Sequence, residues 1–304
     1  MHHLFLINPK AGPRDRSGEV AQAARALCEV LGEPCRVRCS EYPGHLTEMA
    51  REAGQSGKET RVYACGGDGT LNEVVTGAVG YENLSVTSFP CGSGNDFIKQ
   101  FAAPELFFEM QNFGAAETQR VDVIRVNDRY ALNICSVGFD ARIGTAIDAY
   151  RRHPLLSGPR AYHASVAVNL VKGVAKPLRV ETAEGLVVDG RMTLVCICNG
   201  SWYGGSYHPV PQADIQDGLL DVLIVKKVSR LTVARVISAY QKGKFEDYPQ
   251  LITHCRTRSL RLATPTVEPV NLDGELLSTS SIACELLPGA LKFFAPPGAW
   301  KQSP

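Results

Sequence analysis

Three short stretches of the chain place glycine beside amide, hydroxyl or carboxylate side chains. They read NPKAG (8–12), GGDGT (66–70) and GSGND (92–96). A tight turn needs one or two glycines, so the three in 66–70 exceed that requirement, and close approach of the backbone to another group is the second usual reason for glycine. Exposed backbone N–H groups at the start of a helix favour a phosphate. The stretches therefore predict a polyphosphate site.

Each stretch follows an apolar segment that is typical of a strand, namely HLFLIN (3–8), RVYAC (61–65) and LSVTSF (84–89). Apolar residues at helical spacing lie between them. This alternation predicts a parallel sheet with helices on both faces, and the loops after its strands meet at one edge, where ligands bind. For one turn alone, Asp68 or Thr70 could simply cap the next helix. Three turns at one edge favour a ligand site.

From about residue 121 the pattern changes to short strands separated by polar turns, with a hairpin expected at Asn127-Asp128. Helices are expected at 159–173 and 231–245. The predicted fold class is α/β, with an N-terminal doubly wound three-layer domain that carries the GGDGT phosphate loop and a second domain that is mostly an antiparallel β-sandwich. We expect the first domain to span 1–125, rejoined by 287–304, and the second to span 126–286.

Composition excludes several classes of protein. The 304 residues hold 32 Lys and Arg against 31 Asp and Glu, a net charge of +1, so no global field points to nucleic acid. The sequence contains no run of about 18 apolar residues, so no transmembrane helix is expected. No secretory signal is recognisable. The ten cysteines form no CxxC pair, which argues against zinc and for free thiols in a reducing compartment. We expect a cytoplasmic protein.

The chain lacks GxxxxGK[ST] and GxGxxG, so neither a P-loop nor a dinucleotide-binding fold is indicated. NPKAG, GGDGTLNEVV and PCGSGNDF, in this order, resemble the diacylglycerol kinase catalytic family of lipid kinases, which includes soluble bacterial diacylglycerol kinases and the sphingosine and ceramide kinases. LNICSVGFDARI (132–143) and NLDGE (271–275) resemble its later blocks. NAD kinases and phosphofructokinases carry turns similar to GGDGT, but GSGND and the second-domain blocks separate this chain from them.

The resemblance implies ATP- and Mg²⁺-dependent phosphorylation of a hydroxyl of diacylglycerol or a related lipid, and a role in phospholipid biosynthesis. It assigns the nucleotide to Asn8, Pro9, Lys10, Ala11, Gly12, Ser40, Gly66, Gly67, Asp68, Gly69, Thr70, Leu71, Asn72, Ser93 and Asn95. Ser40 and Ser93 stand where the family commonly has threonine. Asp68 would hold Mg²⁺ or its water shell with the help of Asp96 and Asp122. Taken singly, Asp96 could be a helix cap and Asp122 part of a strand-edge turn.

Two Asp-Gly turns complete the expected site. In NLDGE, the resemblance makes either Asp273 or Glu275 the catalytic base, and the alternative is an ordinary hairpin. In ADIQDGLLDV (213–222), it implies a structural Mg²⁺ held at Asp214, Asp217 and Leu219, where a hairpin is again the alternative.

The expected partners are a lipid substrate and the surface of a membrane, with no nucleic acid; a homodimer is left open. YRRHPLLSGPRAYH (150–163) mixes arginine with leucine, which suits transient association with an anionic membrane as well as it suits a solvated loop. Two other functions are kept as alternatives: a kinase of a soluble acceptor, as in NAD kinases, and a non-catalytic regulator that binds a nucleotide or a lipid.

Overall fold

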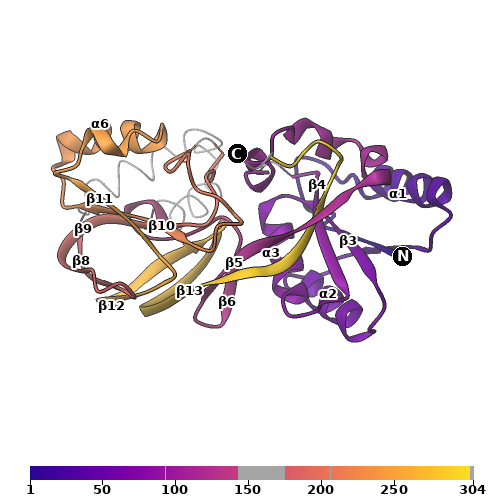
Figure 1. The fold of residues 1–304 in the computed structure, drawn as a ribbon, viewed down its shortest axis with the longest axis horizontal. Coiled ribbons are helices and arrows are strands. Elements are labelled where there is room, and N and C mark those ends of the chain that lie inside the picture. The colour runs from indigo at the N-terminus through magenta and orange to yellow at the C-terminus, as the bar shows by residue number, and fades with distance from the viewer. Residues whose placement is uncertain (93, 143–174, 206, 302–304) are drawn as a thin grey trace. The chain divides into compact units, whose positions relative to one another are not determined.

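The computed structural model describes residues 1–92, 94–142, 175–205 and 207–301, and the chain divides into two compact units (Figure 1). The first unit comprises Met1–Val123 and Pro288–Pro304, and the second comprises Ile124–Leu287. Two strands supply residues to both units: β5 (Glu117–Val126) and β13 (Glu275–Ala295).

The sheet of the first unit has the strand order β2–β1–β3–β4, and all of these pairs are parallel. The strands are β1 (His2–Ile7), β2 (Cys35–Cys39), β3 (Thr60–Gly66) and β4 (Leu84–Pro90), and the end of β13 pairs with β4. The helices are α1 (Ser17–Leu31), α2 (His45–Gln55) and α3 (Asp68–Ala78). In Figure 1, α1 lies on one side of the sheet and α2 and α3 on the other. The predicted doubly wound arrangement is confirmed.

Helices on both faces explain why β1, β3 and β4 are buried almost throughout, since neither face meets water. An aromatic core lies against the sheet, in which the rings of Phe5 and Tyr63 stack with centroids 4.1 Å apart and Phe294 meets Tyr63 edge-on. Three short 3-10 helices follow β4: η1 (Phe97–Gln100), η2 (Pro104–Phe108) and η3 (Met110–Ala115).

In the second unit, the described strands pair antiparallel. They are β6 (Arg129–Ala131), β7 (Ile134–Gly138), β8 (Lys176–Thr182), β9 (Val187–Cys198), β10 (Leu220–Lys226), β11 (Ile252–Thr257) and β12 (Ser259–Leu272), together with parts of β5 and β13. The β5–β6 hairpin turns at Asn127-Asp128, as predicted, and Asn127 has φ +53°. The expected β-rich second domain is confirmed.

The second unit contains two apolar clusters, and successive residues of the central strand β9 supply them alternately. Val195 and Ile197 point into one cluster, whereas Cys196 and Cys198 point into the other. Because both faces of β9 are covered, LVCICNG carries no polar face. Helix α6 (Arg230–Gln241) covers the second cluster with Val233, Val236 and Tyr240, among others.

Some predictions from the sequence fall on parts of the chain that the structure does not describe. The expected helix at 159–173, the segment 150–163 and Ser93 all lie outside the described residues. Within the described residues, no helix is long and apolar enough to cross a membrane. All ten cysteines are free thiols, and only Cys35 and Cys39 are exposed.

Candidate active site

The three glycine-containing loops of the first unit are joined by backbone hydrogen bonds. The N–H of Asn8, just after β1, donates to the carbonyl of Cys65 at 3.1 Å. The N–H groups of Cys91 and Gly92 both donate to the carbonyl of Gly66, at 2.8 and 3.1 Å. The loops after β1, β3 and β4 therefore meet at the carboxyl edge of the sheet, as the alternation of strands and helices predicts.

Direct contact between two of these loops accounts for part of their glycine content. A Cβ at Gly67 would lie 2.7 Å from the carbonyl oxygen of Gly94, and one at Gly92 would lie 2.7 Å from the N and Cα of Gly67. Gly67 has φ −108° and ψ −166°, so its backbone conformation does not itself require glycine. The sequence predicts that these glycines admit a phosphate; the structure shows in addition that they let the two loops touch.

Helix α3 begins at this junction without a side-chain cap. Gly67 is its N-cap residue, and among the described residues no side-chain cap hydrogen bond is present at this helix start. The hydroxyl of Thr70 instead accepts a hydrogen bond from the side-chain amide of Asn8 at 3.2 Å. The simpler interpretation, in which Asp68 or Thr70 caps α3, is therefore not supported, and no described side chain caps the positive end of the helix dipole.

Asp68 uses its carboxylate to hold the loop after β4. Its two oxygens accept the N–H of Asp96 at 2.8 and 2.9 Å, and one also accepts the N–H of Phe97 at 3.2 Å. Burial raises the pKa of Asp68 and the negative charge of Asp96 adds to the increase, while the N–H donors of Asp96 and Phe97 lower it. Two N–H groups thus occupy part of the acceptor capacity of this carboxylate, and Mg²⁺ would meet it either at a remaining lone pair or through water.

The three carboxylates expected around Mg²⁺ have separate local partners. Asp96 is buried and forms an ion pair with Lys99 at 2.5 Å. Asp122 is also buried, and one of its oxygens accepts the N–H of Gly289 at 2.7 Å. Among the described residues, no group of three or more His, Cys, Asp or Glu side chains could hold a metal. Asp68 and Asp96 are neighbours through the N–H of Asp96, whereas Asp122 accepts the N–H of Gly289, and a joint role of the three carboxylates around Mg²⁺ stays a prediction.

The other expected nucleotide contacts lie around the same edge. The carbonyl oxygen of the Asn8 side chain accepts the N–H of Lys10 at 3.0 Å, which shapes the turn, and the Lys10 side chain is exposed. Ser40 follows β2 and donates its N–H to the carbonyl of Ile7 at 2.8 Å. Asn95 donates its amide to the carbonyl of Gly92 at 3.0 Å, whereas its own side-chain oxygen is buried without a partner in the described part of the chain. An unsatisfied buried acceptor favours a ligand that donates a hydrogen bond.

The remaining assigned residues fit the same turn. Ala11 closes it by donating its N–H to the carbonyl of Asn8 at 3.1 Å, and Gly12, at φ +81°, approaches the carbonyl of Cys91 closely. Leu71 and Asn72 are buried in the first turns of α3. The N–H of Leu71 donates to the carbonyl of Gly67 at 3.0 Å, and a nucleotide contact at these two positions stays a prediction.

The turn between β12 and β13 separates the two candidate bases. The carboxylate of Asp273 accepts three backbone N–H groups, from Leu132 at 2.5 Å, Asn133 at 3.0 Å and Ile134 at 2.8 Å. Asp273 and Gly274 have φ +51° and +97°, so Asp-Gly forms a tight hairpin as well. Glu275 begins β13 with an exposed side chain. Asp273 thus fixes the hairpin, whereas the carboxylate of Glu275 is exposed.

The second Asp-Gly turn, expected to hold a structural Mg²⁺, already contains a cation. The guanidinium of Arg256 on β11 pairs with one oxygen of Asp217, and the other oxygen accepts the N–H of Leu219 at 2.9 Å. The carboxylate of Asp214 accepts the N–H of Gln216 within the turn. Burial raises the pKa of Asp217, and Leu219 and Arg256 oppose that change. These residues do not fit a Mg²⁺ ion unless Arg256 moves away.

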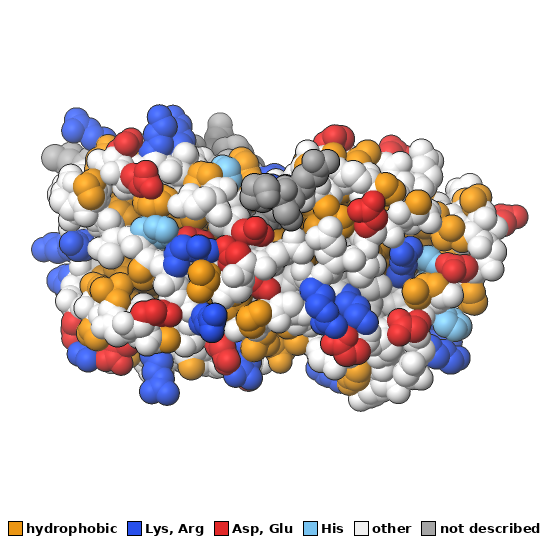
Figure 2. Space-filling view, viewed as in Figure 1, with side chains coloured by type: hydrophobic (Ala, Val, Ile, Leu, Met, Phe, Trp, Pro, Cys, Tyr) orange, Lys and Arg blue, Asp and Glu red, His pale blue; other side chains and the backbone are white. Residues whose placement is uncertain are grey.

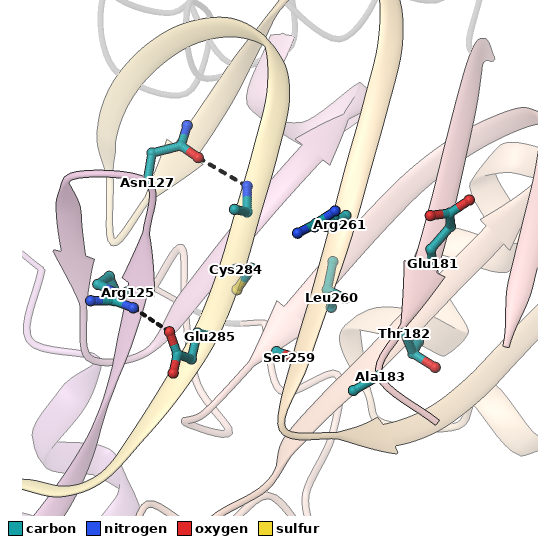
Figure 3. Close-up of a pocket in the computed structure, with 11 residues that line it drawn as sticks. Arg125, Asn127, Glu181, Thr182, Ala183, Ser259, Leu260, Arg261, Cys284 and Glu285 are labelled. Carbon is teal, nitrogen blue, oxygen red and sulfur yellow. Dashed lines mark hydrogen bonds and ion pairs between the residues drawn. The ribbon is translucent and has the colours of Figure 1, made fainter. Parts of the chain in front are cut away.

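Figure 3 shows a hollow of about 390 Å³ on the sheet of the second unit. Arg125 of β5 pairs there with Glu285 of β13, and Arg261 of β12 lies opposite Glu181 of β8. The hollow contains none of the residues that the sequence assigns to chemistry. Because its charges balance, it offers no preference for a phosphate.

Sequence reasoning did not single out Asp140, a partly buried acid of the second unit. Its carboxylate accepts the N–H of Ala141 at 2.7 Å and the hydroxyl of Tyr203 at 3.3 Å, and Tyr203 in turn contacts the hydroxyl of Tyr240 at 2.9 Å. Burial raises the pKa of Asp140. The signal in the sequence is a lone aspartate within the apolar run SVGFDA. Asp140 lines an apolar cavity beneath α6, next to Phe139 and Val233.

Comparison with known proteins gives the family of this chain. Residues 2–126 match the diacylglycerol kinase catalytic domain, and residues 133–295 match the YegS C-terminal NAD kinase beta sandwich-like domain. The chain belongs to this family, the YegS-like branch of the diacylglycerol kinase catalytic family, and the resemblance noted in its motifs is confirmed.

Whole-chain relatives agree with the domain matches. A protein of Chromohalobacter salexigens named "Probable lipid kinase YegS-like" is 31% identical over 92% of this chain and 90% of its own length. One of the same name from Shewanella frigidimarina is 29% identical, over 97% and 94%. The crystal structure of a diacylglycerol kinase from Bacillus anthracis has the same fold, with a TM-score of 0.72, 22% identity and 98% of each chain covered.

Proposed function

We propose that this protein is a lipid kinase that transfers the terminal phosphoryl group of ATP to a hydroxyl of diacylglycerol or a related lipid. The observation that carries the proposal is the edge of the first sheet, where three loops meet around the start of α3 and no described side chain caps that helix. Such a helix end is suited to a polyphosphate. The buried oxygen of Asn95, which has no partner among the described residues, would accept a hydrogen bond from the nucleotide.

Within this proposal each residue has a separate task. The backbone N–H groups at the start of α3 bind the phosphates, and the exposed ammonium of Lys10 neutralises their charge. Asn8 holds its own loop to Thr70, and Asp68 holds the loop after β4, so both keep the donors in place. Bound Mg²⁺ would neutralise charge on the transferred phosphoryl group, with Asp68 and Asp96 ordering its water shell.

We assign the general base to Glu275. A base must have an oxygen available for the proton of the acceptor hydroxyl. Glu275 is exposed, whereas Asp273 accepts three backbone N–H groups. The proton of the lipid hydroxyl would pass to the Glu275 carboxylate as the hydroxyl oxygen attacks phosphorus and ADP leaves.

The acceptor class rests on the family, since the relatives that cover most of this chain are named lipid kinases. The test is a panel of acceptors with labelled ATP and Mg²⁺, containing diacylglycerol, ceramide, sphingosine, phosphatidylglycerol and NAD, with Glu275→Gln as the inactive control. Label in a lipid that depends on Glu275 would support the proposal. Label in NAD alone would identify a kinase of a soluble acceptor, and nucleotide binding without transfer to any acceptor would indicate a regulator.

A further inference from the structure

The segment from Lys226 to Phe245, which contains α6, carries charge of one sign. It holds six Lys and Arg residues and no Asp or Glu. The whole chain balances 32 basic residues against 31 acidic ones, so this is a local concentration that the net charge of +1 conceals. Acidic residues resume only with Glu246 and Asp247 in the following 3-10 helix η4 (Phe245–Asp247).

Most of these basic side chains are exposed on the surface of the second unit. We define the α6 cationic surface as the five exposed side chains of Lys226, Lys227, Arg235, Lys242 and Lys244. None of them forms an ion pair in the part of the chain that the structure describes. Other exposed arginines do pair with acids: examples are Arg120 with Glu82, Arg125 with Glu285 and Arg179 with Glu181.

The inner face of the same helix fixes this orientation. Val233, Val236 and Tyr240 are buried in an apolar cluster, and they follow one another at helical spacing. The helix therefore cannot rotate its charges inward or insert its apolar face elsewhere without uncovering that cluster. A hollow of about 450 Å³ opens on the outer side, where Arg235, Lys242 and Lys244 outnumber the single acid Asp247. In the view of Figure 2, basic side chains gather over α6.

We propose that the α6 cationic surface docks the protein on an anionic phospholipid bilayer. This inference rests on the proposed function, because a lipid acceptor resides in a membrane that the enzyme must reach. Lys and Arg near such a surface are attracted to its anionic headgroups without entering the hydrocarbon. Since the apolar face of α6 is already buried, the docking is electrostatic, and salt weakens it as the screening length shortens.

The experiment is co-sedimentation of the full chain with vesicles at low ionic strength and without nucleotide. Vesicles of phosphatidylglycerol and phosphatidylcholine are compared with vesicles of phosphatidylcholine alone. The test variant is Arg235→Gln/Lys242→Gln/Lys244→Gln. The matched control is Arg25→Gln/Arg51→Gln/Lys58→Gln, which removes the same charge from exposed residues of the first unit. Thermal melts of both variants check the fold.

We expect the parent and the control to bind the anionic vesicles and the test variant to bind on the order of one hundredfold more weakly, since each basic residue contributes about a factor of five. Parent-like binding by the test variant, or equal losses in the test and control variants, would overturn the proposal. Equal binding of the parent to neutral vesicles would overturn it too. So would tighter binding of the parent to duplex DNA, which would identify the surface as a nucleic-acid site.

A kinase assay separates this inference from the proposed function. With a short-chain diacylglycerol dispersed in neutral detergent, the test variant should phosphorylate at the parent rate, because no charged bilayer is present. If no acceptor is phosphorylated while anionic vesicles still bind through α6, the proposed function fails and the surface assignment stands. If phosphorylation proceeds but the three substitutions leave vesicle binding unchanged, only the surface assignment fails.

Discussion

The carboxylate of Asp68 accepts the backbone N–H of Asp96 at 2.8 and 2.9 Å, and thereby ties the turn before α3 to the loop after β4. The N–H of Asp68 itself donates to the carbonyl of Gly94 at 2.9 Å, so the two loops are joined in both directions. Asp68 is therefore first a positioning residue, whose contribution to phosphoryl transfer would pass through the loops that it holds and through the water around Mg²⁺.

The substitution Asp68→Asn tests that role. An asparagine oxygen can still accept the N–H of Asp96, so the fold should survive, whereas the charge next to the phosphates and metal is lost. We expect kcat to fall by about 10²- to 10⁴-fold, measured with labelled ATP across a Mg²⁺ titration. A variant with parent kcat and parent Mg²⁺ dependence would show that this carboxylate is only a structural link.

The raised pKa of Asp68 also predicts a dependence of stability on pH. A carboxyl whose pKa is higher in the folded chain binds its proton more tightly when folded, so stability falls as the pH rises from the unfolded pKa to the folded one. The asparagine of Asp68→Asn cannot ionise, so this variant does not lose stability through residue 68 as the pH rises. We expect the stability of the variant relative to the parent to rise as the pH increases through that window, in urea titrations from about pH 3 to pH 8. The reverse trend would show that the N–H donors lower the pKa of Asp68 by more than burial raises it.

Gly67→Ala examines the contact between the loops. The added Cβ would lie 2.7 Å from the carbonyl oxygen of Gly94, and neither backbone segment can yield freely. We expect a loss of about 1–3 kcal/mol in the free energy of unfolding together with weaker ATP binding by calorimetry. The control is Gly18→Ala, where a Cβ meets no heavy atom within 4 Å and the residue lies in α1. That variant should be as stable as the parent or slightly more stable.

The hairpin at 271–275 allows the two candidate bases to be tested by different measurements. Asp273→Asn leaves at least one of three backbone N–H groups without its acceptor, which should cost about 1–3 kcal/mol of stability. Glu275→Gln removes an exposed carboxylate, so the melting temperature should stay unchanged while kcat falls by about 10²- to 10⁴-fold. ATP affinity should be retained in Glu275→Gln. Full activity in Glu275→Gln and its loss in a folded Asp273→Asn protein would reverse the assignment.

Local signals in the sequence were sufficient to predict the turns and the layered arrangement of strands and helices. Asn127-Asp128 and Asp273-Gly274 form the expected tight hairpins because their residues tolerate positive φ, and α1 ends at Gly32 in the left-handed conformation. The alternation of apolar strands and amphipathic helices was sufficient to predict the parallel sheet and the edge where its loops meet. These features depend on residues close together in the chain.

The partners of the carboxylates could not be predicted in the same way, because tertiary structure selects them. Asp68 bonds to a residue 28 positions away, and Asp273 to residues about 140 positions away. Each carboxylate could equally have bound a metal, capped a helix or accepted a proton. The sequence therefore identified Asp273 and Glu275 together, and only the three N–H donors to Asp273 distinguish them.

The last prediction concerns Arg256, whose guanidinium contacts Asp217 and lies 3.6 Å from the buried Asp221. If this side chain serves as the cation of the Asp214–Leu219 turn, Mg²⁺ without nucleotide should barely change the melting temperature of the parent. Arg256→Gln frees the carboxylate of Asp217, so this variant should be less stable by about 1–3 kcal/mol and should regain part of the loss as Mg²⁺ is added, by linkage to binding.

Two controls complete the test of Arg256. Asp217→Ala/Arg256→Gln has no carboxylate left at this position and should not respond to Mg²⁺. Arg179→Gln breaks another exposed ion pair of the same unit, so it reports what an arginine contributes where no metal is expected. A Mg²⁺ response in the parent as large as that of Arg256→Gln would mean that the ion displaces the guanidinium readily. The structural metal implied by the family would then apply to this chain after all.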